Sequence, residues 1–578
     1  MRDGVRLAVE LFLPKGLPSS ERIPALLIQT RYWRYEQLRL PFKWFFSPEA
    51  LAPDMKEFKP FFTSHGYAMV YVDVRGTGAS FGVWSYPWPE ESFEDAREIV
   101  DWIISQTWSN GRVGGIGVSY VGTTAELLAA LQHPAVLAVA PLFNHPDAYI
   151  DIAFPGGLLN DRFIRQWGLM DLSLDNNIVP AEYGRLVKFL LRGVKPVDGQ
   201  AGKALLKEAV REHASNGNVY AIAHEIVFRD QLHPEIGKAI DELAIHKYHE
   251  ALHNTHTAVL GWGSWMDAGT ADAVLRRFHT YPSAQQAVIG AWEHGGRFHA
   301  SPYQKRTIPS NPPPNVQWRE LLRFFDTYLK GEDNGLQAER ILHYYTMGEE
   351  KWKRTSTWPP PGVQPQRWYL SEAQALSRTA PEDIAGGDIY QVDFNASTGL
   401  NNRWWELSSI LNQTVYYPDH ASDQHLLSYT SAPLEQDLEI TGYPVVSLTV
   451  SSSEPDGAFF AYLEDVDPGG GVTYLTEGQL RAIHRKVSDQ SPPYRLQMPY
   501  HTFKQEDAMP LVPGEPAEIT FGLLPTSTLV RKGHCIRLSL AGHDDGTFAR
   551  IPTEGIPVIT VHRNRIHGSW IDLPVSQR

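Results

Sequence analysis

The sequence predicts an α/β domain with a mostly parallel sheet and a helical insertion, followed by a C-terminal β-sandwich. Three observations support this prediction. Apolar strand patterns alternate with helical patterns over residues 1–145 and again over 251–350, strand patterns fade between those two stretches, and beyond residue 350 short strands follow one another with Gly- and Pro-rich turns. Since 578 residues are too many for one hydrophobic core, we expect two or three domains.

Residues 1–145 form the first half of the predicted α/β domain. Strands that are apolar on both faces and separated by helices are typical of a parallel sheet covered on both sides. We predict strands at Val5–Pro14, Ile23–Thr30, Tyr67–Val74, Val113–Val118 and Ala135–Leu142, and helices at Phe93–Gln106 and Tyr120–Gln132.

Residues 146–250 are predicted to form a helical cap over the carboxyl edge of this sheet, with helices at Leu205–Ala214 and Ile236–Tyr248. The α/β pattern resumes over residues 251–350, so that the catalytic domain would consist of 1–145 together with 251–350. Here we predict strands at Thr257–Trp262 and Ala287–Trp292 and an amphipathic helix at Val316–Lys330.

Residues 351–578 contain strand patterns without intervening helices, which favours a β-sandwich of the jelly-roll type. The run Trp358-Pro359-Pro360-Pro361 cannot continue a helix and is predicted to be the linker into this domain. The predicted strands include Leu438–Ser451, Ala458–Val466, Glu518–Pro525 and Cys535–Gly542.

The composition excludes several classes of protein. The net charge is −14 and no basic stripe is present, so we expect no nucleic-acid partner. No apolar run reaches membrane-spanning length, and we expect no membrane partner. A homo-oligomer is compatible with the sequence. The single cysteine, Cys535, cannot form an internal disulfide. We expect a cytoplasmic protein, or a secreted or periplasmic one if a targeting segment precedes this numbering.

The central chemical signal is the segment Gly117-Val118-Ser119-Tyr120-Val121-Gly122, which lies between a predicted strand and a predicted helix. A serine on such a sharp turn is lifted clear of the sheet, and the helix N-terminus stabilises developing negative charge. The usual pattern is G-x-S-x-G, whereas here the second glycine falls one residue later, at Gly122. We predict that Ser119 is a nucleophile.

A nucleophilic serine needs a base, and the base needs an orienting carboxylate. In α/β-hydrolases the chain order is serine, acid, histidine, each at the end of a strand. Asp267 follows one predicted strand, and His294 follows the next and precedes two glycines. The sequence therefore predicts a serine hydrolase with the triad Ser119, Asp267 and His294, which cleaves an ester or an amide.

The chain resembles the cocaine esterase and X-prolyl dipeptidyl aminopeptidase family of α/β-hydrolases along nearly its whole length. The resemblance includes the displaced Gly122. The segments that carry it are Arg2-Asp3-Gly4-Val5, Asp73-Val74-Arg75-Gly76, Gly117-Val118-Ser119-Tyr120, Gly261-Trp262 before Asp267, Gly290 and Trp292 before His294, and Gly442 with Val450-Ser451-Ser452-Ser453.

The resemblance also implies an oxyanion hole and part of a substrate pocket. In the family, a tyrosine after the second strand and the amide that follows the nucleophile both donate hydrogen bonds to the oxyanion. In this chain these donors would be the Tyr32 hydroxyl and the Tyr120 amide. The neighbours of Tyr32 differ from the Asn-Pro-Tyr of the family. Trp167 stands where the family has a substrate-contacting tryptophan, although packing explains it equally well, and we expect Phe154 to contact the substrate too.

Several other features are expected to have no catalytic role. Asp73-Val74-Arg75-Gly76-Thr77-Gly78 lacks the spacing of a phosphate loop, and we expect it to buttress the site. His253, His256 and His299 do not show a zinc spacing, so that we expect no metal, and we expect no cofactor. Glu293, beside His294, is expected to be a solvated charge.

The predicted activity is hydrolysis of a carboxylic ester through an acyl-enzyme. The alternatives are an acylase or X-Pro dipeptidyl peptidase that cleaves an amide and, from another class, a non-catalytic binding protein. The family members that select α-amino acyl groups carry carboxylates just after the catalytic aspartate, whereas Asp267 is followed by Ala268-Gly269-Thr270. We therefore expect uncharged acyl groups, unless a carboxylate such as Asp147 or Asp151 reaches the site.

Overall fold

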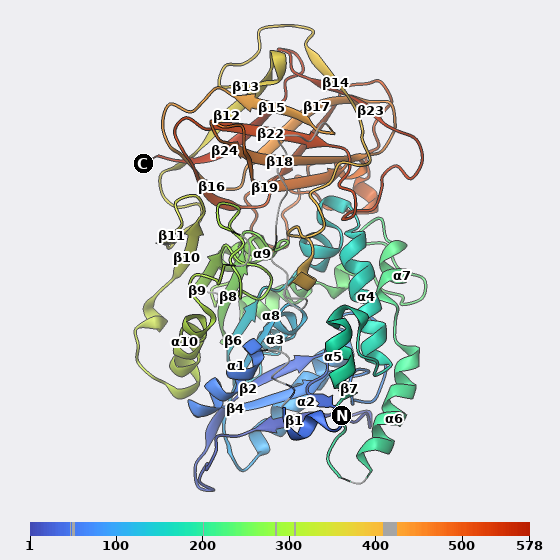
Figure 1. The fold of residues 1–578 in the computed structure, drawn as a ribbon, viewed down its shortest axis with the longest axis vertical. Coiled ribbons are helices and arrows are strands. Elements are labelled where there is room, and N and C mark those ends of the chain that lie inside the picture. The colour runs from blue at the N-terminus through green and yellow to red at the C-terminus, as the bar shows by residue number, and fades with distance from the viewer. Residues whose placement is uncertain are drawn as a thin grey trace.

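The computed structural model describes residues 1–46, 48, 53–199, 201–283, 286–305, 308–408, 415 and 425–577. Figure 1 shows the sandwich at one end of the molecule and the α/β domain with its helical insertion at the other. This is the predicted fold class: a mostly parallel sheet with a helical insert, followed by an antiparallel β-sandwich. In the described residues, no helix combines the length and apolar character that crossing a bilayer requires.

The first sheet has nine strands in the order β1-β4-β2-β5-β6-β8-β9-β10-β11. The strands from β4 to β10 are parallel, and the two edge strands β1 and β11 are antiparallel to their neighbours. The bounds are β1 Val9–Phe12, β2 Ile23–Thr30, β4 Ala68–Asp73, β5 Ser109–Val118, β6 Val136–Leu142, β8 Ala258–Ser264, β9 Gln286–Gly290, β10 Ile341–Thr346 and β11 Lys351–Thr355.

The central strands are apolar on both faces because helices cover both. All eight residues of β2 are buried. One face packs against α2, α3 and α8, and the other against α1 and α10. The bounds are α1 Pro53–Ser64, α2 Glu90–Ser105, α3 Tyr120–Ala130, α8 His249–His253, α9 Thr270–Thr280 and α10 Pro314–Phe325, the last continued by a π-helical turn at Asp326–Lys330.

The segment between β6 and β8 forms the helical insertion, which we call the cap. It contains α4 Asp161–Asp175, α5 Gly184–Leu190, α6 Gly202–Glu212, α7 Val219–His224 and the short strand β7 Leu191–Val194, which pairs with β3 Glu36–Leu38. The predicted helix at Ile236–Tyr248 is wrong. It consists of 3-10 turns at Ile240–Leu243 and Ile245–Tyr248, because Ala239 and Ala244 are extended and interrupt any longer helix.

The sandwich consists of antiparallel strands, except for the parallel pair β13 and β15. The predicted strand Leu438–Ser451 is two strands, because Pro444 cannot donate to a ladder and one of the neighbouring strands changes there. The bounds are β12 Val363–Ser371, β13 Ala375–Ser377, β14 Gly387–Gln391, β15 Leu427–Ser431, β16 Leu438–Gly442, β17 Val445–Ser452, β18 Ala458–Val466, β19 Val472–Arg481, β20 Ala517–Gly522, β21 Thr526–Val530, β22 Cys535–Ala541, β23 Val558–His562 and β24 Trp570–Ser576.

The two parts share one apolar core, which brings a sandwich loop to the α/β domain. Trp358, in the predicted linker, is buried and stacks on Trp265 with ring centroids 5.5 Å apart. Arg403 donates to the Trp265 carbonyl, and its own carbonyl accepts from the Ala268 amide at 2.9 Å. The boundary expected between residues 350 and 351 falls between the paired strands β10 and β11. The loop that contains Asp267 is thus supported by the C-terminal part of the chain.

Candidate active site

Ser119 occupies the sharp turn between β5 and α3. Its backbone has φ 62° and ψ −126°, a conformation that costs a non-glycine residue about 1–3 kcal/mol and persists where surrounding contacts impose it. The Ser119 amide donates to the Leu142 carbonyl at 2.9 Å. A Cβ at Gly117 would lie 2.3 Å from the Val121 side chain, and one at Gly122 would lie 2.7 Å from the Leu142 oxygen. Close packing around the turn therefore explains both glycines, including the displaced one.

Asp267 and His294 are hydrogen-bonded at the carboxyl ends of β8 and β9. Nδ1 of His294 lies 3.0 Å from Oδ1 and 2.9 Å from Oδ2 of Asp267. Thr270 Oγ1 donates to the Asp267 carbonyl at 2.8 Å, and Ser264 Oγ bonds both the amide and the carbonyl of Trp292. These contacts fix the two loops relative to each other. With Nδ1 donating to the carboxylate, Nε2 is the basic nitrogen of the ring.

Strands β5, β6, β8 and β9 are successive neighbours, so Ser119, Asp267 and His294 lie at the same edge of the sheet. Phe143, directly after β6, packs edge-on against His294 with centroids 6.1 Å apart. Within the described part of the chain no hydrogen bond joins Ser119 to His294. Such catalytic contacts often tighten only when substrate binds, and the role of Ser119 stays a prediction.

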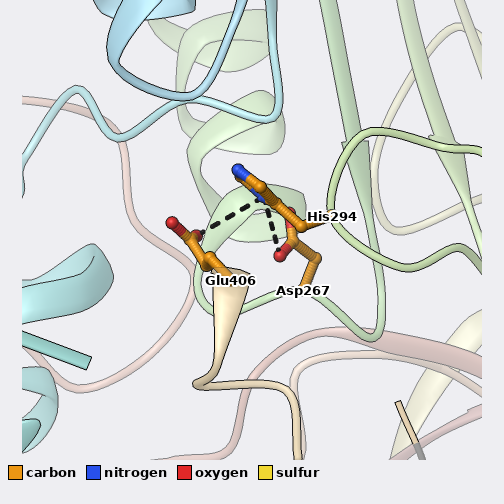
Figure 2. Close-up of side chains that lie close together, drawn as sticks. All are labelled: Asp267, His294 and Glu406. Atoms are coloured by element: carbon orange, nitrogen blue, oxygen red, sulfur yellow. Dashed lines mark hydrogen bonds and ion pairs between the residues drawn. The ribbon is translucent and has the colours of Figure 1, made fainter. Parts of the chain in front are cut away.

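A second carboxylate, Glu406, approaches the same histidine from the C-terminal part of the chain. Its Oε1 lies 3.8 Å from His294 Nδ1, and the same oxygen is hydrogen-bonded to Nε2 of His145, in the loop that follows β6. Figure 2 shows Asp267 and Glu406 both directed toward one ring nitrogen. We did not predict Glu406 or His145, because a lone glutamate in the sandwich half matches no catalytic motif.

The charges of these groups set the basicity of His294. Burial lowers the pKa of His294, but the charges of Asp267 and Glu406 and the hydrogen bond to Asp267 outweigh burial and raise it to about 9. Burial likewise opposes the charged form of His145, yet Glu406 holds the pKa of His145 above its usual value. Burial raises the pKa of Glu406, but His145 and His294 bring it below its usual value. Glu406 and His145 therefore form a buried ion pair beside His294.

The expectation that Glu293 is a solvated charge is wrong. Its side chain is fully buried, and Oε1 accepts a hydrogen bond from the Arg297 amide at 2.9 Å. Burial raises the pKa of Glu293 to about 8. A glutamate in this position is mostly protonated at pH 7 and adds little negative charge beside His294.

The Tyr32 hydroxyl is arranged as a hydrogen-bond donor. It accepts a hydrogen bond from Nε1 of Trp167 at 2.9 Å, and no described residue accepts its proton. Burial raises the pKa of the phenol, so that it stays protonated. The Tyr32 ring packs edge-on against Tyr120, the first residue of α3, whose amide has no carbonyl partner within the helix. The two residues of the predicted oxyanion hole are therefore in contact through their rings, and their role stays a prediction.

The residues around Tyr32 are fixed by buried polar contacts. Arg31 forms an ion pair with Asp175 of α4 at 3.0 Å, and Trp33 Nε1 donates to the Leu174 carbonyl at 3.1 Å. Nη1 of Arg34 donates to Asp73 at 2.8 Å. Asp73 begins the segment expected to buttress the site, and a Cβ at Gly78 would lie 2.3 Å from its carboxyl carbon. That segment therefore supports the loop that holds Tyr32.

The two expected substrate-binding residues lie in different surroundings. Trp167 contacts Tyr32 through its indole nitrogen and stacks on Phe163 with centroids 6.1 Å apart. Phe154 is 1% exposed and stacks on Tyr149 in the core of the cap. Trp167 is thus next to the Tyr32 hydroxyl, whereas the Phe154 ring is packed away from solvent. A role in substrate binding stays a prediction for both.

Asp267, His294 and Glu406 also offer three potential metal ligands within 4.8 Å of one another. The same atoms are already engaged with each other and with His145. Hydrogen bonding therefore accounts for this cluster without an ion. A cavity of about 100 Å³ lies between cap and sandwich, and it is lined by residues that include Arg229, Tyr494 and Phe503 and none of Ser119, Asp267 and His294.

Two family models match this chain. Residues 3–296 match the model described as X-Pro dipeptidyl-peptidase (S15 family), and residues 334–569 match the model of the X-Pro dipeptidyl-peptidase C-terminal non-catalytic domain. The chain belongs to the S15 family. It is a serine hydrolase of this family, with the family's C-terminal domain, as the resemblance in its sequence implied.

Named relatives of this S15 family chain include esterases. It is 44% identical to the Mycobacterium tuberculosis protein named "Putative serine esterase MT1883", over 100% of this chain and 94% of that protein. It is 25% identical to the cocaine esterase of a Rhodococcus species, over 100% of this chain and 97% of that enzyme. The structure of a CocE/NonD family hydrolase from Staphylococcus aureus superimposes with a TM-score of 0.70 at 20% identity, over 100% of this chain and 92% of that one, which shows the shared fold.

Proposed function

We propose that this chain is an esterase that hydrolyses carboxylic esters of uncharged acyl groups through an acyl-enzyme on Ser119. The observation that carries the proposal is the hydrogen bond from His294 Nδ1 to Asp267 at the edge of the sheet where Ser119 sits on its strained turn. The names of the 44% and 25% identical relatives support ester hydrolysis.

In this mechanism, Ser119 Oγ attacks the ester carbonyl carbon while His294 Nε2 takes its proton. Asp267 stays ionised and stabilises the imidazolium. The carbonyl oxygen becomes an oxyanion that accepts hydrogen bonds from the Tyr32 hydroxyl and the Tyr120 amide. His294 then protonates the departing alcohol. Water attacks the acyl-enzyme with the same assistance from His294 and releases the acid.

A fluorophosphonate probe tests whether Ser119 is an activated nucleophile. The wild-type chain should be labelled, and the label should be found on the peptide that contains Ser119. Ser119→Ala should not be labelled, whereas Ser105→Ala, at the exposed end of α2, should be labelled as the wild type is. Labelling of another serine with equal speed would contradict the assignment.

Amide cleavage is the second candidate, because the matching family model is named for an X-Pro dipeptidyl peptidase. Selecting a substrate by its free amino group requires a carboxylate available to the ammonium. The candidates are engaged elsewhere: Asp147 accepts from Arg229 and Tyr494, each at 2.9 Å, and Asp151 accepts from Arg276. Glu406 is paired with His145. This pairing favours an ester with an uncharged acyl group.

We predict at least a tenfold preference for a phenylacetate ester over the matched phenylglycine ester at a pH where the amine is protonated. Placing an ammonium near the triad without a free carboxylate would cost several kcal/mol, and tenfold corresponds to only about 1.4 kcal/mol. The measurement is kcat/KM for the two esters with the same leaving alcohol. A tenfold preference for the amino ester would favour an α-amino acid ester hydrolase instead.

The pH dependence of kcat/KM should report the raised pKa of His294. Because the base must be neutral, and its pKa lies at about 9, activity should rise with pH between neutrality and pH 9. Glu406→Gln removes one of the negative charges that raise this pKa, so the acidic limb should move to lower pH. The buried Glu464→Gln, which loses a carboxylate bonded to Ser539 within the sandwich, is the matched control. An unmoved limb in Glu406→Gln would show that Glu406 has only a structural role.

A further inference from the structure

Two segments, one after β3 and one within the cap, expose an unusual number of large apolar side chains. We call residues 39–46 and 184–192 the basic aromatic patch. Of the five exposed Trp and Phe side chains in the described residues, four lie here: Trp44, Phe45, Phe46 and Phe189, with Trp102 as the fifth. Leu40 and Leu186 are exposed beside them, and the six side chains are between 59% and 73% accessible. Exposed apolar groups gathered in this way usually mark a binding surface.

The two segments form one continuous surface. Strand β3, just before the first segment, pairs with β7 at the end of the second. The Arg39 amide donates to the Leu190 carbonyl at 2.8 Å, and the rings of Phe42 and Phe189 pack edge-on with centroids 5.4 Å apart. In Figure 1, α5 and β7 lie in the lower half of the molecule, away from the sandwich.

The patch is also basic, in a chain whose net charge is −14. Neither segment contains an Asp or Glu, and together they expose five cations: Arg39, Lys43, Arg185, Lys188 and Arg192. A symmetric dimer formed through this patch would bring the same positive groups of two copies together. The charge therefore disfavours a second copy and favours an anionic partner.

We propose that the basic aromatic patch binds the surface of an anionic phospholipid membrane. Trp and Phe side chains enter the boundary between headgroups and acyl chains, while Lys and Arg reach the phosphates. Each Lys or Arg near such a surface adds to binding, and the attraction is screened by salt. Our expectation of no membrane partner rested on the lack of a spanning segment, and peripheral binding requires none.

Membrane binding through the patch would bring the membrane close to the candidate site. Val187 and Leu190 of α5 pack against the large apolar core, and Tyr183, directly before α5, lies close enough to Tyr32 for the charge of Tyr32 to act on it. Tyr32 lies four residues before β3 on the same stretch of chain. A membrane bound to the patch would thus adjoin the region of the oxyanion donor. The binding itself does not depend on the triad assignment.

Cosedimentation of the full-length protein with vesicles tests the proposal. We expect binding to vesicles that contain phosphatidylglycerol, little binding to phosphatidylcholine alone, and release by added salt. Trp44→Ser with Phe45→Ser, and separately Lys43→Glu with Lys188→Glu, should each weaken binding at least about tenfold. Hydrolysis of a soluble short-chain ester should stay at the wild-type level, which shows that the variants are folded.

Matched controls change the same residue types elsewhere. Trp102→Ser removes the exposed tryptophan of α2, and Lys203→Glu with Lys207→Glu reverses two exposed charges on the cap helix α6. These variants should bind as the wild type does. Equal binding of the wild type to both kinds of vesicle, or equal losses in patch and control variants, would overturn the proposal. If the wild type is a dimer that does not bind vesicles, and the patch variants are monomers, the patch is an interface between copies instead.

Discussion

Ser119→Ala and His294→Ala should each lower kcat for an ester substrate by a factor on the order of 10⁶. Without Oγ no acyl-enzyme forms, and without the imidazole the hydroxyl is not activated. The double variant should be barely worse than either single one, because the members of a triad act as a unit and the residual rate comes from the oxyanion hole and binding. Steady-state kinetics with a chromogenic ester measures all three.

Folding must be checked separately, since both residues lie in tightly packed surroundings. His294 is 4% exposed, and its loss leaves the Asp267 carboxylate without its histidine partner. His294→Gln keeps a hydrogen-bond donor near Asp267 and is the more conservative variant. Thermal unfolding of each variant should show a cooperative transition. A folded Ser119→Ala that kept a tenth of the wild-type kcat would rule out Ser119 as the nucleophile.

The fold was predictable because its signals are local and repeated. Ile23–Thr30 and Ala458–Val466 are strands with the predicted bounds, since continuous apolar runs between turn residues specify buried strands. The predictions failed where contacts between residues far apart in sequence determine the local structure. The stretch 236–248 has a helical pattern, yet Asp241 bonds to Arg229 and His246 in a partly buried polar network, and the chain there forms two short turns.

The residues of the candidate site also fall into those that local sequence signals identify and those that only the folded structure brings together. Ser119, Asp267 and His294 each follow a strand, so their order and position are readable from sequence. Glu406 and His145 are joined only by folding, since they are far apart in sequence and neither stands in a recognisable motif. The burial of Glu293 was equally hidden, because a glutamate beside His294 and two glycines is expected in an exposed loop, whereas its side chain is fully buried.

Tyr32→Phe should lower kcat about 10²–10³-fold, or about 3–4 kcal/mol, with a much smaller change in KM. The variant keeps the ring that packs against Tyr120 and removes only the hydroxyl. A hydrogen bond to the oxyanion strengthens as the carbonyl becomes tetrahedral, so its loss affects the transition state more than the bound ester. The Tyr120 amide would then be the remaining donor.

Two further variants separate this role from packing. Trp167→Phe removes the donor to the Tyr32 hydroxyl, which loses one bond but keeps its own proton for the oxyanion. It should therefore cost much less in kcat than Tyr32→Phe. Tyr183→Phe removes another buried phenol of the cap, whose pKa is raised by burial and by the nearby Tyr32, and it should change kcat little. If Tyr32→Phe had nearly normal kcat, or if all three variants lost activity equally, Tyr32 would be a packing residue of the site and the Tyr120 amide would need another partner.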